Sequence, residues 1–356
     1  MGMGAISRKR NINVEVLRIC SAWLVILTHV LNKNYTDSTG GIRDKVCLLN
    51  TICIVAVPCF FMVAGYFATK GQSIARKLRH VGISVVIPSL IVIFLYQALW
   101  AWITGQASLT QSISQADYGA IWTHSITWSI NKLPGCSTLW YITTYVQLML
   151  MFPVFSLLCA EGKEARNARI TVYALCLSAY FIKDLQQLIS FGGTMFKPFD
   201  RSVFYFLLGY ELSRVDWKKI PVWVPAAGLA AGCAMMYGLT RGIYGISGSF
   251  SDYFFHYETV PCAVASVSAF GLAMKLRCPS PDSKTGKMII QLADATFYVY
   301  LIHNGILYWL MCHTPLGEDS RLRVLALLWL ATGAVSFVLA GIVRKLQKTI
   351  FSPRRA

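Results

Sequence analysis

Residues 14–31 read VEVLRICSAWLVILTHVL, an apolar run that also holds Glu15, Arg18 and His29. A helix needs about 20 mostly apolar residues to cross a bilayer, and this run is close to that length. A basic stretch precedes it, as in a secretory signal peptide. A cleaved signal, however, has an uncharged core and a small-residue cleavage site, and no such site follows here. We therefore predict a retained first membrane helix.

The rest of the chain has the same character. Of its 356 residues, 55% are hydrophobic and 14% are charged, against about 25% charged in an average soluble domain. This excludes a disordered chain and disfavours an ordinary soluble domain. Candidate spans are residues 14–31, 46–68, 81–104, 138–159, 170–183, 202–213, 221–239, 255–274, 289–311 and 322–343. We predict an all-α polytopic membrane helical bundle of about ten transmembrane helices, folded as one domain over residues 1–356.

Positive charge predicts how this bundle is oriented. The net charge is +17, and the Lys and Arg residues gather in alternate loops with a bias of roughly two to one, as the positive-inside rule requires. We expect both termini in the cytoplasm, with basic tails at residues 1–13 and 344–356. The same bias accounts for the positive net charge of the chain, with membrane lipids as its partners, so the charge does not require a nucleic-acid partner. Residues 191–199, between the two shortest runs, are expected to form a re-entrant or outer loop.

The first span carries residues that are costly in a membrane. An ionisable group inside a span costs about 2.5–3.5 kcal/mol, which marks it as a functional candidate. Arg18 and His29 are separated by ten residues, which places them on one helix face, roughly 16 Å apart along the axis. Glu15 lies within pairing reach of Arg18. The alternatives are an interfacial Glu–Arg pair that snorkels to headgroups and a helix-end histidine bonded to a loop.

Other candidates are weaker individually. A basic cluster is formed by Arg76, Lys77 and Arg79. It is either a topology signal or a site that binds phosphate groups. Residues 139–141 begin a span as an aromatic belt. His303 is another intramembrane histidine, either functional or a satisfied core residue. No CxxC pair or metal-ligand spacing occurs in the sequence, so we expect no metal site.

Taken together, the chain resembles the membrane acyltransferase-3 family, which includes O-acetyltransferases of bacterial surface polysaccharides. The resemblance rests on Arg18 and His29 with ten residues between them, with Glu15 where Asp is commoner. It also rests on four segments that follow in the family's order: Pro58–Tyr66, Leu139–Tyr141, Leu207–Tyr210 and Tyr300–His303. Two positions depart from the pattern: Asn304 stands where Pro is often found, and Pro88 lies some distance after Arg79.

The resemblance implies an integral O-acyltransferase of the bacterial inner membrane. Its donor would be cytoplasmic acyl-CoA, acetyl-CoA above all, and its acceptor a hydroxyl of an extracytoplasmic or lipid-linked glycan. No permanently bound cofactor is expected. Acyl transfer needs a base for the hydroxyl proton and stabilisation of the oxyanion. The residues expected to act are His29, Arg18 and Glu15 in catalysis, Arg76, Lys77, Arg79 and Tyr66 at the acyl-CoA, and Trp140, Tyr141, Tyr300 and His303 at the acceptor.

Several alternatives stay open on the sequence. His29 could act as the base or could itself accept the acyl group. Intramembrane Glu, Arg and His are also what a proton-coupled transporter of the envelope would show. A non-catalytic partner in an envelope complex is a third reading. Substrate uptake without acetyl consumption would favour the transporter, and function that survives loss of His29 would favour the scaffold.

Overall fold

The computed structural model of the protein describes residues 10–32, 41–68, 74–127, 129–189, 199–248, 250–317 and 321–351. The expected basic tails at residues 1–13 and 344–356 therefore lie only partly within the described residues. Residues 191–198, most of the expected loop at 191–199, lie outside them.

The described chain is helical, and no strand occurs in it. The elements are α1 (Ile12–Asn32), α2 (Gly41–Cys53), α3 (Ala56–Ala68), α4 (Ile74–Val81), the π-helical turn η1 (Gly82–Val86), α5 (Ile87–Ile103), α6 (Leu109–Ser114), α7 (Tyr118–Ile126), α8 (Trp140–Leu150), α9 (Phe152–Leu158), α10 (Lys163–Ile189), α11 (Arg201–Leu212), α12 (Trp223–Ser247), α13 (Val260–Met274), α14 (Lys284–His313) and α15 (Leu322–Phe351). The all-α prediction is confirmed, and each of the predicted apolar runs falls on a helix or on a pair of helices.

Five segments are long and apolar enough to cross a membrane: Ile12–Asn32, Arg43–Phe67, Ala75–Ile103, Tyr253–Met274 and Leu322–Gln347. A sixth candidate is a bent pair, Ser137–Leu150 with Phe152–Leu158. These spans support a membrane protein. The larger number of about ten transmembrane helices, with both termini inside, stays a prediction. One reason is that α11 has 12 residues, too few to cross about 30 Å of hydrocarbon.

Two of the predicted single spans are broken, and a proline lies at each break. A proline removes the hydrogen bond to the carbonyl four residues earlier and clashes with that carbonyl. For Pro58 that carbonyl belongs to Ile54, which forms the turn between α2 and α3. Pro153 is the second residue of α9, which follows α8 after a bend of 62°. The break at Ile54 brings the end of α2 and the start of α3 to one place in the bundle, where a cavity is found.

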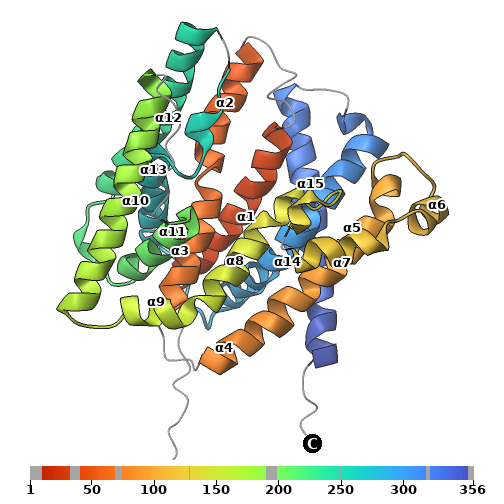
Figure 1. The fold of residues 1–356 in the computed structure, drawn as a ribbon, viewed down its shortest axis with the longest axis horizontal. Coiled ribbons are helices and arrows are strands. Elements are labelled where there is room, and N and C mark those ends of the chain that lie inside the picture. The colour runs from red at the N-terminus through yellow and green to blue at the C-terminus, as the bar shows by residue number, and fades with distance from the viewer. Residues whose placement is uncertain are drawn as a thin grey trace, which may run out of the picture.

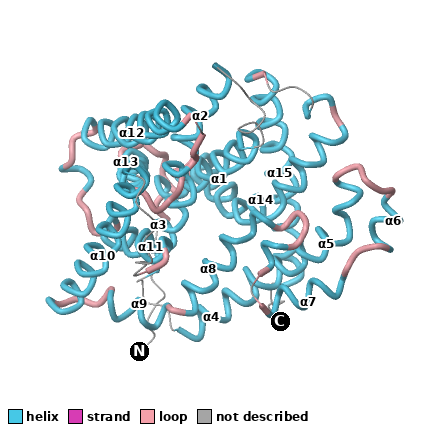
Figure 2. Tube along the Cα trace, turned by 45° about the horizontal axis from the view of Figure 1, so that its top comes forward, coloured by secondary structure: helices cyan, strands magenta, loops and turns pink. Residues whose placement is uncertain are grey.

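Helix α1 lies at the centre of the bundle, among α2, α3, α13, α14 and α15 (Figures 1 and 2). Helices α5, α6 and α7 form a flank to one side, and α10, α12 and α13 form the other (Figure 1). The central position explains why a helix with charged residues is tolerated. Its polar side chains face other helices, so they can be paired there instead of facing lipid.

Helices α3 and α11 touch backbone to backbone through two glycines. A Cβ on Gly65 would lie 1.8 Å from the carbonyl oxygen of Phe206, and one on Gly209 would lie 1.9 Å from that of Met62. Only glycine permits this approach, which is the usual way small residues join membrane helices. Both glycines belong to sequence segments that carried the family resemblance, and this packing gives those positions a structural reason.

Ion pairs hold one end of the bundle together. Arg10, just before α1, donates to Asp294 of α14 at 2.5 Å, and Arg344 of α15 bonds the same carboxylate. Near the ends of α9 and α11, Arg214 bonds Glu161 at 2.7 Å and holds the pKa of that carboxyl below its usual value. We call the end that contains Arg10, Asp294 and Arg344 the basic end. The opposite end, where α1 finishes, is the His29 end.

Candidate functional site

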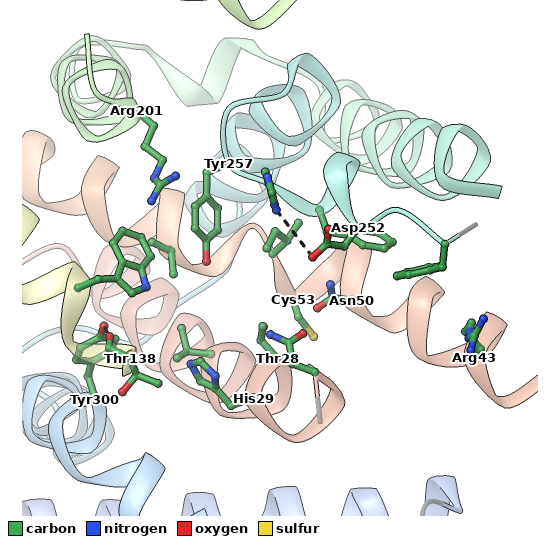
Figure 3. Close-up of a pocket in the computed structure, with 18 residues that line it drawn as sticks. Thr28, His29, Arg43, Asn50, Cys53, Thr138, Arg201, Asp252, Tyr257 and Tyr300 are labelled. Carbon is green, nitrogen blue, oxygen red and sulfur yellow. Dashed lines mark hydrogen bonds and ion pairs between the residues drawn. The ribbon is translucent and has the colours of Figure 1, made fainter. Parts of the chain in front are cut away.

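A cavity of about 790 Å³ opens at the His29 end. It lies between the last turns of α1, the break between α2 and α3, the start of α8, the start of α11, the segment before α13 and the middle of α14. Its lining residues are Val25, Thr28, His29, Asn32, Arg43, Asn50, Cys53, Ile54, Val57, Thr138, Trp140, Arg201, Phe250, Asp252, Phe255, His256, Tyr257 and Tyr300. Figure 3 shows His29 and Thr138 on one side of this space and Arg201 and Tyr257 on the other.

Two histidines meet at the wall of the cavity. The rings of His29 on α1 and His303 on α14 lie 5.2 Å apart between centroids. His29 lines the cavity, whereas His303 is 0% exposed behind it. The sequence predicts separate roles for these two residues, one as the base and one at the acceptor. The structure makes them neighbours.

The surroundings of His303 fix which of its nitrogens carries the proton. Its Nδ1 lies 2.7 Å from the carbonyl oxygen of Tyr300 and 3.2 Å from that of Val299. Carbonyl oxygens only accept hydrogen bonds, so Nδ1 of a neutral ring must be the donor and Nε2 must hold the lone pair. That Nε2 is buried and has no hydrogen-bond partner in the described part of the chain. His303 is therefore a hydrogen-bond acceptor beside His29.

A tyrosine from α5 shapes the helical turn that carries His303. The hydroxyl of Tyr96 donates to the carbonyl of Leu301 at 3.0 Å and accepts from the N–H of Gly305 at 2.9 Å. In a regular α-helix these two backbone groups would bond to each other. Tyr96 thus inserts into the hydrogen-bond ladder of α14 around His303.

The chain before α8 closes the cavity on the side of α14. Tyr300 bonds the carbonyl of Thr138, and Asn304 donates to the carbonyl of Gly135 at 3.1 Å. Asn304 is the position where the family pattern often has Pro, and here its side chain ties α14 to this segment. Within it, Leu133, Cys136 and Leu139 are buried. The end of the segment between α7 and α8 therefore enters the bundle and forms a wall of the site.

Aromatic rings link the cavity to the interior. Trp140 and Tyr300, which are both predicted at the acceptor, line the cavity. Tyr141 lies behind them, 5.3 Å from the ring of Tyr300 and 4.7 Å from that of Phe61. Of the four residues predicted at the acceptor, two reach the cavity and Tyr141 and His303 support them from behind.

A family model described as an acyltransferase domain matches residues 11–344. This chain belongs to the acyltransferase-3 family. The match runs from the residue before α1 to the last third of α15, so the acyltransferase-3 domain includes the cavity and both ends of the bundle. No curated protein and no solved structure matches the chain. Family membership indicates a membrane acyltransferase and leaves its donor and acceptor to be proposed.

The first helix of this acyltransferase-3 domain pairs its two charged residues. Arg18 donates to Glu15 at 2.9 Å, and the second oxygen of Glu15 lies 3.6 Å from Arg10. Glu15 is 2% exposed. Arg18 also interacts electrostatically with the hydroxyls of Tyr141 and Tyr145 on α8. Arg18 and His29 therefore both face other helices, as their shared stripe predicts.

The cavity does not extend along that whole stripe. On α1 its lining stops at Val25, so it includes His29 and not Arg18. Tyr141 and Tyr300 occupy the space toward α8 and α14. Of the helix face that Arg18 and His29 share, only the His29 part therefore borders the cavity.

The residues expected at the donor lie away from the cavity. Tyr66 accepts a hydrogen bond from Asn11 at 3.0 Å, which places it beside the start of α1. Lys77 on α4 lies 3.2 Å above the ring centroid of Phe152 on α9. Arg76 and Arg79 are exposed on the same short helix. These residues border the basic end, and none of them lines the cavity.

Arg201 is a cavity residue that the sequence analysis does not predict. It is the first residue of α11, capped by Asp200. Its guanidinium carbon lies 4.7 Å from the ring centroid of Trp140 and 5.3 Å from that of Tyr257. In the sequence it looks like a cation that flanks an apolar run. Its role depends on packing between three distant segments, which no local pattern reveals.

Among the described residues, no group of three or more His, Cys, Asp or Glu side chains could hold a metal ion.

Proposed function

We propose that this acyltransferase-3 protein transfers an acyl group, acetyl in the first instance, from acyl-CoA to a hydroxyl of a glycan or lipid-linked sugar bound in the cavity. The observation that carries the proposal is the histidine pair. His29 faces the cavity, and His303 presents an unpaired lone pair behind it. A neutral imidazole has the proton affinity that general-base catalysis near neutral pH requires.

In the proposed reaction, His29 takes the proton of the acceptor hydroxyl as its oxygen attacks the thioester carbonyl. The tetrahedral oxyanion then collapses, the C–S bond breaks, and the imidazolium returns the proton to the leaving thiolate. Nε2 of His303 can accept a hydrogen bond from the second nitrogen of His29, which would orient the ring and stabilise its charged form. Thr138 offers a hydroxyl donor in the cavity wall for the oxyanion. A covalent acyl-His29 intermediate would use the same residues in two steps.

The donor is proposed to approach from the basic end, with its phosphates near Arg76, Lys77 and Arg79. Its thioester must then cover the roughly 16 Å of α1 between Arg18 and His29. Because the cavity stops at Val25, this path requires the rings of Tyr141 and Tyr300 to turn aside when the donor binds. This route also fits the expected orientation in a bacterial inner membrane, with the basic end in the cytoplasm and the His29 end outside.

The test follows acetyl label from donor to acceptor. Membranes that carry the protein receive radiolabelled acetyl-CoA, and label is measured in the lipid-linked and polysaccharide fractions. His29→Ala is compared with His313→Ala, because His313 is exposed and stacks on Trp309 outside the cavity. We expect label in a glycan fraction with the wild type and His313→Ala, and none with His29→Ala. Equal labelling by His29→Ala would refute the role of His29, and no label from the wild type would refute the proposed donor and acceptor pair.

A further inference from the structure

The guanidinium of Arg201 stands in the cavity wall with part of its hydrogen-bonding capacity unused. It packs against Trp140 and Tyr257, which both line the cavity. Its Nη1 lies 3.4 Å from Glu258, while its Nε is buried without a hydrogen-bond partner in the described residues. Burying a charged donor without a partner is costly, so such a group calls for an explanation.

Glu258 does not neutralise Arg201 by itself. The same carboxylate also forms a close ion pair with Lys183 of α10. Arg201 therefore shares its carboxylate partner with a second cation. Among the residues that line the cavity, two are arginines, Arg43 and Arg201, and one is a carboxylate, Asp252, which lies 3.9 Å from His256. The side chains that line the cavity thus include one more arginine than carboxylate.

Unpartnered polar atoms elsewhere in the lining of the cavity indicate a hydroxyl-rich ligand. Oδ1 of Asn50 and Oγ1 of Thr138 are both buried and without a hydrogen-bond partner in the described part of the chain. Both residues line the cavity, and Figure 3 shows Thr138 beside His29. Buried polar groups of this kind are normally satisfied, and several around one cavity point to a ligand with several hydroxyl groups.

We propose that the acceptor sugar carries an oxyanion, a carboxylate or a phosphate, which Arg201 binds while a hydroxyl of the same molecule lies at His29. This inference rests on the proposed function, because it names the class of acceptor for that site. Guanidinium groups bind carboxylates and phosphates through paired N–H bonds, and packing against aromatic rings holds the planar group in place. A neutral sugar would leave the Nε of Arg201 without its partner, which is a basis for discrimination.

The test measures binding without chemistry. Full-length protein in neutral detergent is titrated at constant ionic strength with glucuronate, glucose 1-phosphate, glucose or coenzyme A, and the thermal unfolding midpoint is recorded. We expect glucuronate, glucose 1-phosphate or both to raise the midpoint, and glucose to raise it much less. The first two probes distinguish a sugar carboxylate from the phosphate of a lipid-linked sugar. In Arg201→Gln we expect the apparent affinity for the anionic probe to fall at least tenfold.

Two further variants make the result specific. Arg241→Gln removes a cation that pairs with Asp44 outside the cavity, and it should bind as the wild type does. Arg201→Lys keeps the charge without the paired N–H geometry, and it should also lose at least tenfold in affinity. It replaces Arg201→Gln if that variant does not fold. His29→Ala should keep the anion-dependent shift, so failure of acyl transfer and failure of oxyanion binding can be told apart.

The outcomes that overturn the inference are equally clear. They are equal shifts with glucose and with the anionic sugars, anion binding that survives in both Arg201 variants, and no shift with any probe. A shift that coenzyme A alone produces, and that both Arg201 variants lose, would assign Arg201 to the donor phosphates and would also overturn it.

Discussion

The two ends of α1 handle charge in opposite ways. At the basic end, Glu15 faces Arg18 and Arg10, and Asp294 bonds Arg10 and Arg344, so each carboxylate there meets two cations. At the His29 end, buried polar atoms of Asn50, Thr138, Arg201 and His303 have no partner within the described chain. The basic end therefore pairs these carboxylates within the protein, whereas at the His29 end the proposed acceptor would supply the missing partners.

The largest expected effect is a loss of acyl transfer when a residue of the His29 end alone is changed. Removing a general base lowers a rate by about 10²–10⁴-fold. We expect His29→Ala to lose acyl transfer by a factor in that range and to keep its unfolding midpoint, because the side chain borders a cavity instead of filling the core. The measurement is initial rate at saturating acetyl-CoA, together with thermal unfolding. A variant that lost both activity and stability would make His29 a structural residue.

The second prediction concerns the packing of α3 against α11, which supports both ends of the bundle. Helix α3 carries Val57, which lines the cavity, and Tyr66, which lies beside the start of α1. Gly65 allows α3 to pack closely against α11. A methyl group at Gly65 would meet backbone that cannot give way, so Gly65→Ala should lower the free energy of unfolding by about 3 kcal/mol. Gly238→Ala on α12 meets nothing within 4 Å and is the matched control. The loss is measured by denaturant titration in detergent, and equal stability of the two variants would contradict the packing argument.

The third prediction tests whether the basic end is structural, donor-binding or both. Arg18→Ala removes the closer partner of buried Glu15 and leaves Arg10 at 3.6 Å. We expect a loss of about 2 kcal/mol in unfolding free energy, since part of the pairing remains. The proposed donor route also predicts a higher KM for acetyl-CoA, with much of kcat retained. Lys219→Ala, which removes an exposed surface cation, is the control. Normal donor affinity in Arg18→Ala would leave this residue a structural role alone.

The smallest effect sharpens the description of the histidine pair. Tyr96→Phe lets the carbonyl of Leu301 and the N–H of Gly305 bond to each other, so the cost in unfolding free energy should be about 1 kcal/mol. Closing that turn would move His303 relative to His29. We expect a several-fold decrease in kcat with KM for acetyl-CoA unchanged, measured by the same label assay. An unchanged kcat would show that the position of His303 does not matter to the reaction.

The sequence was sufficient for the helices and for part of the site. Long apolar runs predict helices because hydrocarbon forces the backbone to bond internally, and the spacing of Glu15, Arg18 and His29 follows from helix geometry. The break at Ile54 could have been anticipated from Pro58, because the lost hydrogen bond lies four residues earlier. The number of helices that cross the membrane stays a prediction, and the short run at 202–213 already indicates that its helix is too short to span by itself.

The cavity itself was beyond the sequence. Arg201, Trp140 and Tyr257 are far apart along the chain, and only tertiary packing brings the cation to the two rings. In the same way, nothing local to Tyr96 indicates that its hydroxyl enters the ladder of α14. The place of Tyr66 beside Asn11 follows from packing at the start of α1, and its role at the donor stays a prediction.

Two hydrogen bonds join α14 to the segment before α8, and we call this pair of contacts the clasp. The clasp has a consequence for exchanging segments between related proteins. Tyr300 and Asn304 hold the backbone carbonyls of Thr138 and Gly135, and the same two turns of α14 carry His303. A chimaera that imports a foreign loop between α5 and α8 while keeping this α14 would mismatch the clasp and shift the histidine. The loop and the middle of α14 are therefore one transplantable module, and grafts that aim to change acceptor preference should move them together.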